Sequence, residues 1–479
     1  MNRHLTALAL LVALAGSSAA RQQVDFAGIA ETYLAQHPVP GVAPSDLRLD
    51  DLLEAHYALV PAGVLDFYAP REALADKTQT DDVRDALTAV YQVHGAWIDW
   101  IGAHGEAALQ ARADIADIVK FLKSAKVGPG GTKDSALFEA FAGGSTLKPQ
   151  VERLAAVFRD GSLLGLAPRG GDTQTIVLAP SRKNFVDMAA LFGRLDATTQ
   201  SIYWKDALVG WTEFGRNNHQ VIATQYPPVH LRYDDFSESV AMDAKETTGL
   251  HEHVAQRAAV MACWSFFGNA LDPAFELAVG QTMVIEIYGQ NNTRSGGSGR
   301  PNSSDPTEAF VPGGNPNGGA LPQNNADNRW RSTSGADFFL KVLRECQKVG
   351  AKSAKAKEER LVYFQIQADA GGKKFFVRAP FFGSAAQGKE HPPAEYMADY
   401  LEFYRSYKTL FVHWLRDCSN AKPADARAQL GRLFVEISQA GSAAGFEEVV
   451  KEVYGVEFSA TDLSADTLEH RFLDWLSKQ

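Results

Sequence analysis

The sequence predicts an α+β fold, in which a helical N-terminal region is followed by a region that mixes helices with a small sheet. Within residues 81–125, apolar residues recur at spacings of three and four, which is typical of amphipathic helices, and Trp97 and Trp100 fit this pattern as core anchors. Short β-branched runs replace this pattern between residues 173 and 234 and are typical of buried strands. Helical spacing returns from about residue 392 to residue 478.

The composition is that of a globular protein without the features of a nucleic-acid-binding protein. The 479 residues are enough for two or three domains, and 45% hydrophobic and 22% charged residues are ordinary values. The net charge of −10 opposes non-specific binding to nucleic acid. We therefore expect no nucleic-acid partner.

The first twenty residues have the pattern of a secretory signal peptide. Arg3 and His4 give a basic start, residues 5–15 form an apolar run too short to span a bilayer, and small residues lead up to Ala20. We expect cleavage after about Ala20, a secreted or periplasmic mature chain, and no integral membrane segment after cleavage.

Residues 21–145 are expected to form a helical domain. His94 and His104 lie in this region and are more typical of core-edge or solvated histidines than of ligands. Glycine clusters over residues 127–148 then indicate a boundary. A second domain is expected to extend from residue 146 to residue 479.

Strands and one long helix are expected in the first part of the second domain. The runs at 174–179 and 219–224 predict strands, and the run at 229–234 indicates a third. A helix over residues 247–267 is expected to lie against this sheet.

Two further segments of the second domain have clear patterns. Residues 289–330 are dominated by Gly, Asn, Pro and Ser, a composition that cannot bury enough apolar surface to form a core, and predict a surface insertion. The stretch ERLVYFQIQADAGGKKFFVRAPFF predicts a β-hairpin that turns at Gly371 and Gly372.

Three cysteines, Cys263, Cys346 and Cys418, occur in the chain. An odd number in a secreted protein leaves at least one free thiol, and a buried inert thiol is the expected state of each. One disulfide stays open as an alternative. Because no C-x-x-C occurs, the sequence excludes a structural zinc site of the ribbon type.

The stretch TTGLHEHVAQRAAVMACWSFFG contains a histidine–glutamate pair that resembles part of the H-E-x-x-H zinc motif. In that motif the two histidines are four residues apart, a rotation of about 400°, so both rings point to one ion and the glutamate polarises the bound water. Here His251 and Glu252 are present, but the position four residues beyond His251 is Ala255. His253 is rotated by about 200° and points to the opposite side of the helix.

A zinc peptidase of this class takes its third ligand from a glutamate on a later helix. In the stretch DPAFELAVGQTMVIEIYG, the candidates are Glu276 and Glu286. A catalytic zinc ion needs three protein ligands and one open position, so the missing second histidine leaves this set incomplete.

Three stretches carry a resemblance to a known family. TIVLAPSRKNFVDMAALFG is similar to its opening strand and helix, TTGLHEHVAQRAAVMACWSFFG to its zinc helix, and YRSYKTLFVHWLRD with the C-terminal tail to its closing helices. The chain thus resembles the peptidase-MA-like, gluzincin-type zinc metallopeptidase domains of secreted bacterial proteins. The resemblance implies a zincin-like domain, with a small sheet, an active-site-type helix and C-terminal helices.

The resemblance also implies residue roles. It assigns His251 as a metal ligand, Glu252 as a vestigial general base and Glu276 as the remaining third ligand, while Ala255 occupies the missing ligand position. We therefore expect no bound cofactor and a catalytically inactive protein that binds a peptide, a protein or a cell-envelope polymer.

Three alternatives stay open at this stage. The chain could be an active zinc metallopeptidase whose ligand set is completed by His219, His230 or His391. It could be a non-enzymatic envelope scaffold. The histidine–glutamate pair could also be a coincidence, because such pairs are common.

Overall fold

A computed structural model describes residues 26–43, 46–47, 49–62, 65–71, 77–124, 147–167, 174–179, 211–216, 219–225, 250–268, 270–271, 273–289, 363–367, 374–378, 397–441, 445–458 and 466–478. Several expected features lie outside these residues. They are the signal peptide, the strand at 229–234, nearly all of the insertion at 289–330, and Cys346.

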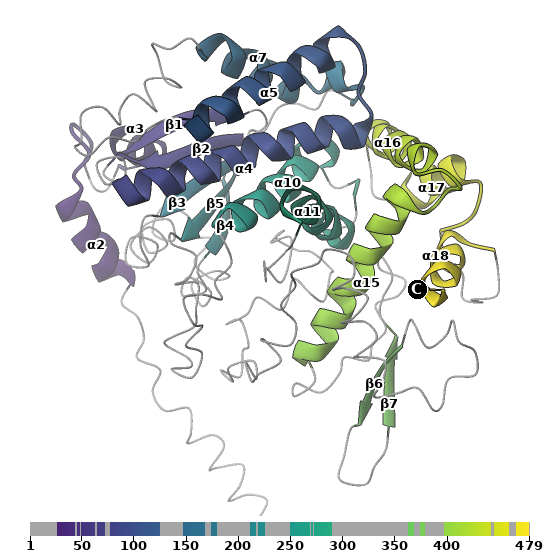
Figure 1. The fold of residues 1–479 in the computed structure, drawn as a ribbon. Helices are drawn as coiled ribbons and strands as arrows, with labels where there is room; N and C mark the ends of the chain where they lie inside the picture. Colours follow the sequence, from purple (N-terminus) through teal and green to yellow (C-terminus); the bar gives the residue numbers. More distant parts are fainter. Residues whose placement is uncertain are drawn as a thin grey trace, which may run out of the picture.

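Helices dominate the described part of the chain (Figure 1), and two sheets accompany them. In chain order the elements are α2 (Phe26–Gln36), α3 (Leu49–His56), β1 (Tyr57–Ala62), β2 (Leu65–Pro70), α4 (Lys77–Ile101), α5 (Glu106–Ser124), α7 (Lys148–Asp160), the 3-10 turn η2 (Ser162–Leu164), β3 (Gln174–Ala179), β4 (Trp211–Arg216), β5 (His219–Gln225), α10 (Leu250–Phe267), α11 (Pro273–Tyr288), β6 (Tyr363–Gln367), β7 (Lys374–Arg378), α15 (Met397–Asp417), α16 (Pro423–Ala440), α17 (Phe446–Tyr454) and α18 (Leu468–Ser477). The presence of both helices and sheets confirms the expected α+β class.

The larger sheet has the strand order β1-β2-β3-β5-β4. β2, β3 and β5 run parallel, and β1 and β4 are added antiparallel at the two edges. The expected strands at 174–179 and 219–224 are therefore confirmed as β3 and β5, which are direct neighbours. The strand pairing of the expected hairpin after residue 360 is also confirmed, because β6 and β7 pair antiparallel, while the expected turn at Gly371 and Gly372 lies outside the described residues.

The expectation of a purely helical region up to residue 145 is wrong for residues 57–70. This stretch forms the hairpin of β1 and β2, and Leu65, Phe67 and Ala69 are buried on one face of β2 while Asp66 and Tyr68 between them are half-buried. This period of two is the mark of a strand. The helical spacing that begins about ten residues later obscured it.

α4 lies at the centre of the main core. Its Trp97 side chain is fully buried, with ring centres 5.6 Å from Phe266 and 5.9 Å from Phe267 of α10 and 5.4 Å from Phe434 of α16. Residues on both sides of the predicted boundary near position 145 thus share one hydrophobic core. Such aromatic pairs stabilise a core beyond the apolar area that they bury.

α10 and α11 form an antiparallel helical hairpin next to α4 and α15 (Figure 1). The expected helix at 247–267 is confirmed as α10, which also contacts β2 and β3. At the centre of the hairpin, a Cβ on Gly280 would lie only 3.0 Å from Cγ2 of Val260 and 3.1 Å from the carbonyl oxygen of Gln256. Glycine at this position allows the two helix backbones to approach closely.

Two side chains fix the outer helices. Asp114 of α5 is buried and accepts hydrogen bonds of 2.7 and 3.0 Å from the guanidinium of Arg153, which holds α7 against α5. The Thr467 hydroxyl accepts a hydrogen bond from the backbone N–H of His470 and caps the start of α18.

The two described cysteines are free thiols. Cys263 lies in the core and Cys418 is partly exposed. No helix in the described part of the chain is long and apolar enough to cross a membrane.

Candidate functional site

The histidine–glutamate pair lies in the first turn of α10. His251 is partly exposed, whereas the Glu252 side chain is 1% exposed. Ala255 is fully buried and belongs to the hydrophobic core. The position that would carry the second zinc ligand is therefore an apolar packing position.

His251 faces the end of α11. Its ring contacts Tyr288, the last residue of that helix, with the ring centres 4.7 Å apart and the planes at 64°. The Tyr288 hydroxyl donates a 3.0 Å hydrogen bond to Oε1 of Gln92 on α4. Three helices thus contribute side chains to one partly exposed group, which we call the His251 cluster: His251, Glu252, Tyr288, Gln92 and Asp85.

Two carboxylates give the His251 cluster a negative potential. Burial raises the pKa of the Tyr288 hydroxyl well above its ordinary value, and the charges of Glu252 and Asp85 raise this pKa further. Ionisation would add a third negative charge beside them. The tyrosine consequently stays protonated and acts as a hydrogen-bond donor.

The structure does not bring Glu276 to His251. Because α10 and α11 are antiparallel and Tyr288 is level with His251, the twelve residues from Tyr288 back to Glu276 place that carboxylate about 18 Å away, at 1.5 Å per residue. Glu276 is fully buried at the far end of the hairpin. The physical reason is that α10 continues without a break to Phe267, so α11 begins opposite the last turns of α10.

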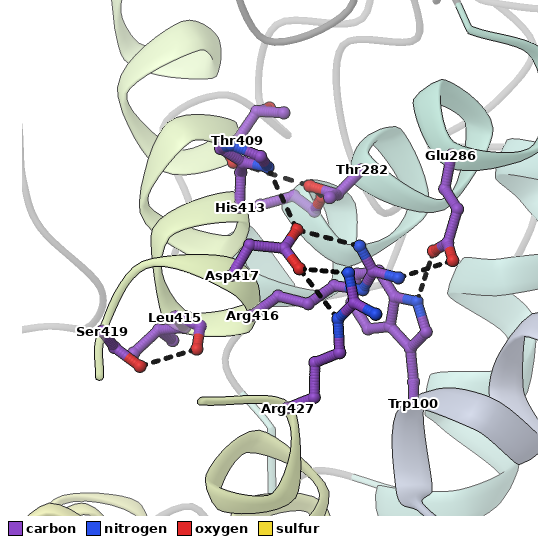
Figure 2. Close-up of polar contacts among 11 residues, drawn as sticks. Trp100, Thr282, Glu286, Thr409, His413, Leu415, Arg416, Asp417, Ser419 and Arg427 are labelled. Carbon is purple, nitrogen blue, oxygen red and sulfur yellow. Dashed lines mark hydrogen bonds and ion pairs between the residues drawn. The ribbon is translucent and has the colours of Figure 1, made fainter. Parts of the chain in front are cut away.

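Glu286, the other glutamate considered as a third ligand, is engaged elsewhere. Its carboxylate accepts hydrogen bonds of 2.6 Å from Nε1 of Trp100 and of 2.5 Å from Nη2 of Arg416, with which it also forms an ion pair (Figure 2). The Arg416 guanidinium also lies over the Trp100 ring, 5.2 Å from its centre. Glu286 therefore joins α11 to α4 and α15.

Arg416 continues this contact into a charged network of α15 and α16 (Figure 2). It donates a 2.9 Å hydrogen bond to Asp417, which also accepts bonds of 2.7 and 2.9 Å from Arg427. His413 lies 3.6 Å from the same carboxylate. Sequence reasoning missed the link from this network to Glu286 and Trp100, because both residues precede Arg416 by more than a hundred positions and no local pattern connects them.

The remaining sequence candidates, His219, His230 and His391, have side chains that lie outside the described part of the chain. Among the described residues, no group of three or more His, Cys, Asp or Glu side chains is placed to hold a metal ion. His219 is the first residue of β5, and its side chain is outside the described part, as are His230, His391 and the side chain of His253.

Comparison of the chain with protein-family models, with curated proteins and with solved structures gives no match. The resemblance to gluzincin-type domains therefore stays a prediction from the sequence.

Proposed function

We propose that the protein is a secreted, metallopeptidase-like protein that binds a peptide or cell-envelope ligand and does not hydrolyse it through zinc. The observation that carries this proposal is the placement of Ala255, which is buried in the apolar core one turn beyond His251.

A catalytic zinc ion would need several ligands around one position, and the described residues of the hairpin of α10 and α11 do not bring such side chains together. A catalytic zinc ion needs three protein ligands around an open position. Ala255 has no donor atom, and Glu276 lies about 18 Å from the level of His251. Glu286 is bound to Trp100 and Arg416.

The groups that remain in the His251 cluster suit binding. An imidazole and a phenol ring provide flat apolar surfaces, and the Tyr288 hydroxyl and the Gln92 amide provide polar groups at a partly exposed site. Recognition sites for small ligands combine aromatic surface with a few fixed polar groups in this way.

The function is tested with the purified chain in two assays. Casein hydrolysis is followed with and without added zinc, and binding is measured by fluorescence anisotropy with a labelled peptide library and by co-sedimentation with peptidoglycan. We expect hydrolysis at the buffer rate, and binding of one ligand class that is weakened at least tenfold by His251→Ala. The matched control is His104→Ala, which truncates an exposed histidine of the loop between α4 and α5.

Zinc-dependent casein hydrolysis that is lost in His251→Ala would identify an active peptidase and refute the proposal. Binding that is equal in His251→Ala and His104→Ala would remove the His251 cluster as the ligand site.

A further inference from the structure

Two histidines meet at the C-terminal ends of two short helices near the start of the described chain. His37 directly follows α2, and His56 is the last residue of α3. A small separate core of Tyr33, Leu34, Leu47 and Leu52 holds the two helices together. The imidazole ring centres are 5.8 Å apart, with the planes at 86°.

The hydrogen bond of His37 fixes which of its ring nitrogens is free. Nδ1 lies 3.1 Å from the carbonyl oxygen of Tyr33, and a carbonyl can only accept, so Nδ1 carries the proton. In the neutral ring Nε2 then holds a lone pair. This arrangement, a backbone carbonyl that orients one imidazole nitrogen, is the one that metal-ligating histidines commonly show.

His56 supplies a second nitrogen. Its Nε2 atom is buried and has no hydrogen-bond partner among the described residues, although the ring as a whole is partly exposed. A buried polar atom without a partner is costly, and a bound ion or water would satisfy it.

The spacing of the two rings suits one shared ion. Imidazoles that bind one metal through bonds of about 2.0–2.1 Å have their ring centres roughly 5–6 Å apart. The 5.8 Å between the ring centres of His37 and His56 falls within this range.

The surrounding charge favours a cation. The C-terminal end of a helix carries a partial negative charge, and both rings lie at such ends. In addition, the segment of residues 26–56 has one basic residue, Arg48, against five acidic ones, namely Glu31, Asp46, Asp50, Asp51 and Glu54.

We propose that His37 and His56 form a binding site for a divalent late transition metal ion, with solvent in the remaining coordination positions. Imidazole ligands select such ions, and Cu²⁺ binds more tightly than Zn²⁺. The ion would link α2 to α3 and so stabilise the N-terminal helices. This site uses neither His251 nor Glu276 and is independent of the proposed ligand binding.

The test is titration of the full chain with Cu²⁺ and with Zn²⁺ in the presence of excess glycine, which suppresses weak sites. We expect one Cu²⁺ ion per chain, and at least tenfold weaker binding in His37→Gln and in His56→Gln. The control His104→Gln removes an exposed histidine and should bind as the wild type does.

Electron paramagnetic resonance of the wild-type Cu²⁺ complex gives a second readout that needs no variant. Coupling of the ion to two imidazole nitrogens supports the site, and coupling to one or none contradicts it. Equal affinity in the wild type and both variants, or the absence of stoichiometric binding in the wild type, would also overturn the proposal.

Discussion

Gly431 of α16 lies against the last turn of α4, so close that a Cβ at this position would be 2.6 Å from the carbonyl oxygen of Ile101. The same Cβ would lie 3.1 Å from the carbonyl oxygen of Trp100. Both obstacles are backbone atoms, which cannot turn aside as a side chain can. Glycine is therefore required where the C-terminal helices meet α4.

We expect Gly431→Ala to lower the free energy of unfolding by about 1–3 kcal/mol, the usual cost of overpacking a core. The matched control is Gly95→Ala on α4, where a Cβ would be 3.7 Å from the side chain of Ile115, an ordinary contact. Because alanine favours helix over glycine, the control should be neutral or stabilise by up to about 1 kcal/mol. Urea unfolding of both variants decides between these outcomes, and equal effects would show that α16 is not held this closely.

The contact of Glu286 with Trp100 and Arg416 predicts a measurable contribution to stability. Glu286→Gln removes the charge that accepts both hydrogen bonds, and we expect a loss of about 1–2 kcal/mol, because hydrogen bonds to charged groups are stronger than neutral ones. Glu436→Gln is the control, since the 3.7 Å pair of Glu436 with Arg432 is too long for a hydrogen bond and should contribute less than about 0.5 kcal/mol. Thermal unfolding at low and high salt measures both, and a loss in Glu286→Gln no larger than in the control contradicts the prediction.

The features that the sequence predicts well are those encoded within one element. α10, the hairpin of β6 and β7 and the strands β3 and β5 each follow from one short window, in which the length of the apolar run and its β-branched residues separate helix from strand. The histidine–glutamate pair was also visible, because it lies within one helical turn.

What the sequence could not supply is the pairing of distant elements. The placement of Glu276 beside His251 came from the family resemblance, whereas the antiparallel hairpin of α10, which runs on to Phe267, and α11 sets the register. The contacts of Glu286 depend on Trp100 and Arg416, far away in the chain. The pairing of His37 with His56 likewise depends on how two short helices pack.

The buried histidine of α4 predicts how stability depends on pH. Burial lowers the pKa of His94 to about 4, against the weaker opposing effect of the Val90 carbonyl, which accepts a 2.7 Å hydrogen bond from Nδ1. Between pH 6.5 and 4 the unfolded chain takes up a proton that the folded chain does not, so stability falls as the pH is lowered through this window. The loss amounts to roughly 3 kcal/mol at and below pH 4.

Urea unfolding of the wild type and His94→Gln at pH 7, 5.5 and 4 tests this dependence. The variant cannot ionise at this position, so its free energy of unfolding should fall less with pH than that of the wild type. His104→Gln, at an exposed position, should keep the wild-type dependence. Parallel pH profiles of the wild type and His94→Gln would show that another group is responsible.

The last prediction concerns the position where the zinc motif is broken. Ala255→His would place two imidazoles four residues apart on α10, as in a zinc helix. In this structure, however, Ala255 is fully buried among apolar side chains, and Glu276 lies about 12 Å along the hairpin from its level. We therefore expect the variant to lose about 1–3 kcal/mol of stability through overpacking, and its zinc affinity to rise less than tenfold.

Ala259→His is the matched control, because Ala259 is equally buried on α10 and lies about two turns beyond His251. Calorimetric titration with Zn²⁺ compares the two variants after their unfolding has been measured. If Ala255→His binds zinc a hundredfold more tightly than Ala259→His, residue 255 faces a site that an ion can reach and is not a packing position of the core. If the two variants bind zinc equally weakly, Ala255 is a packing residue, and one substitution at this turn does not create a metal site.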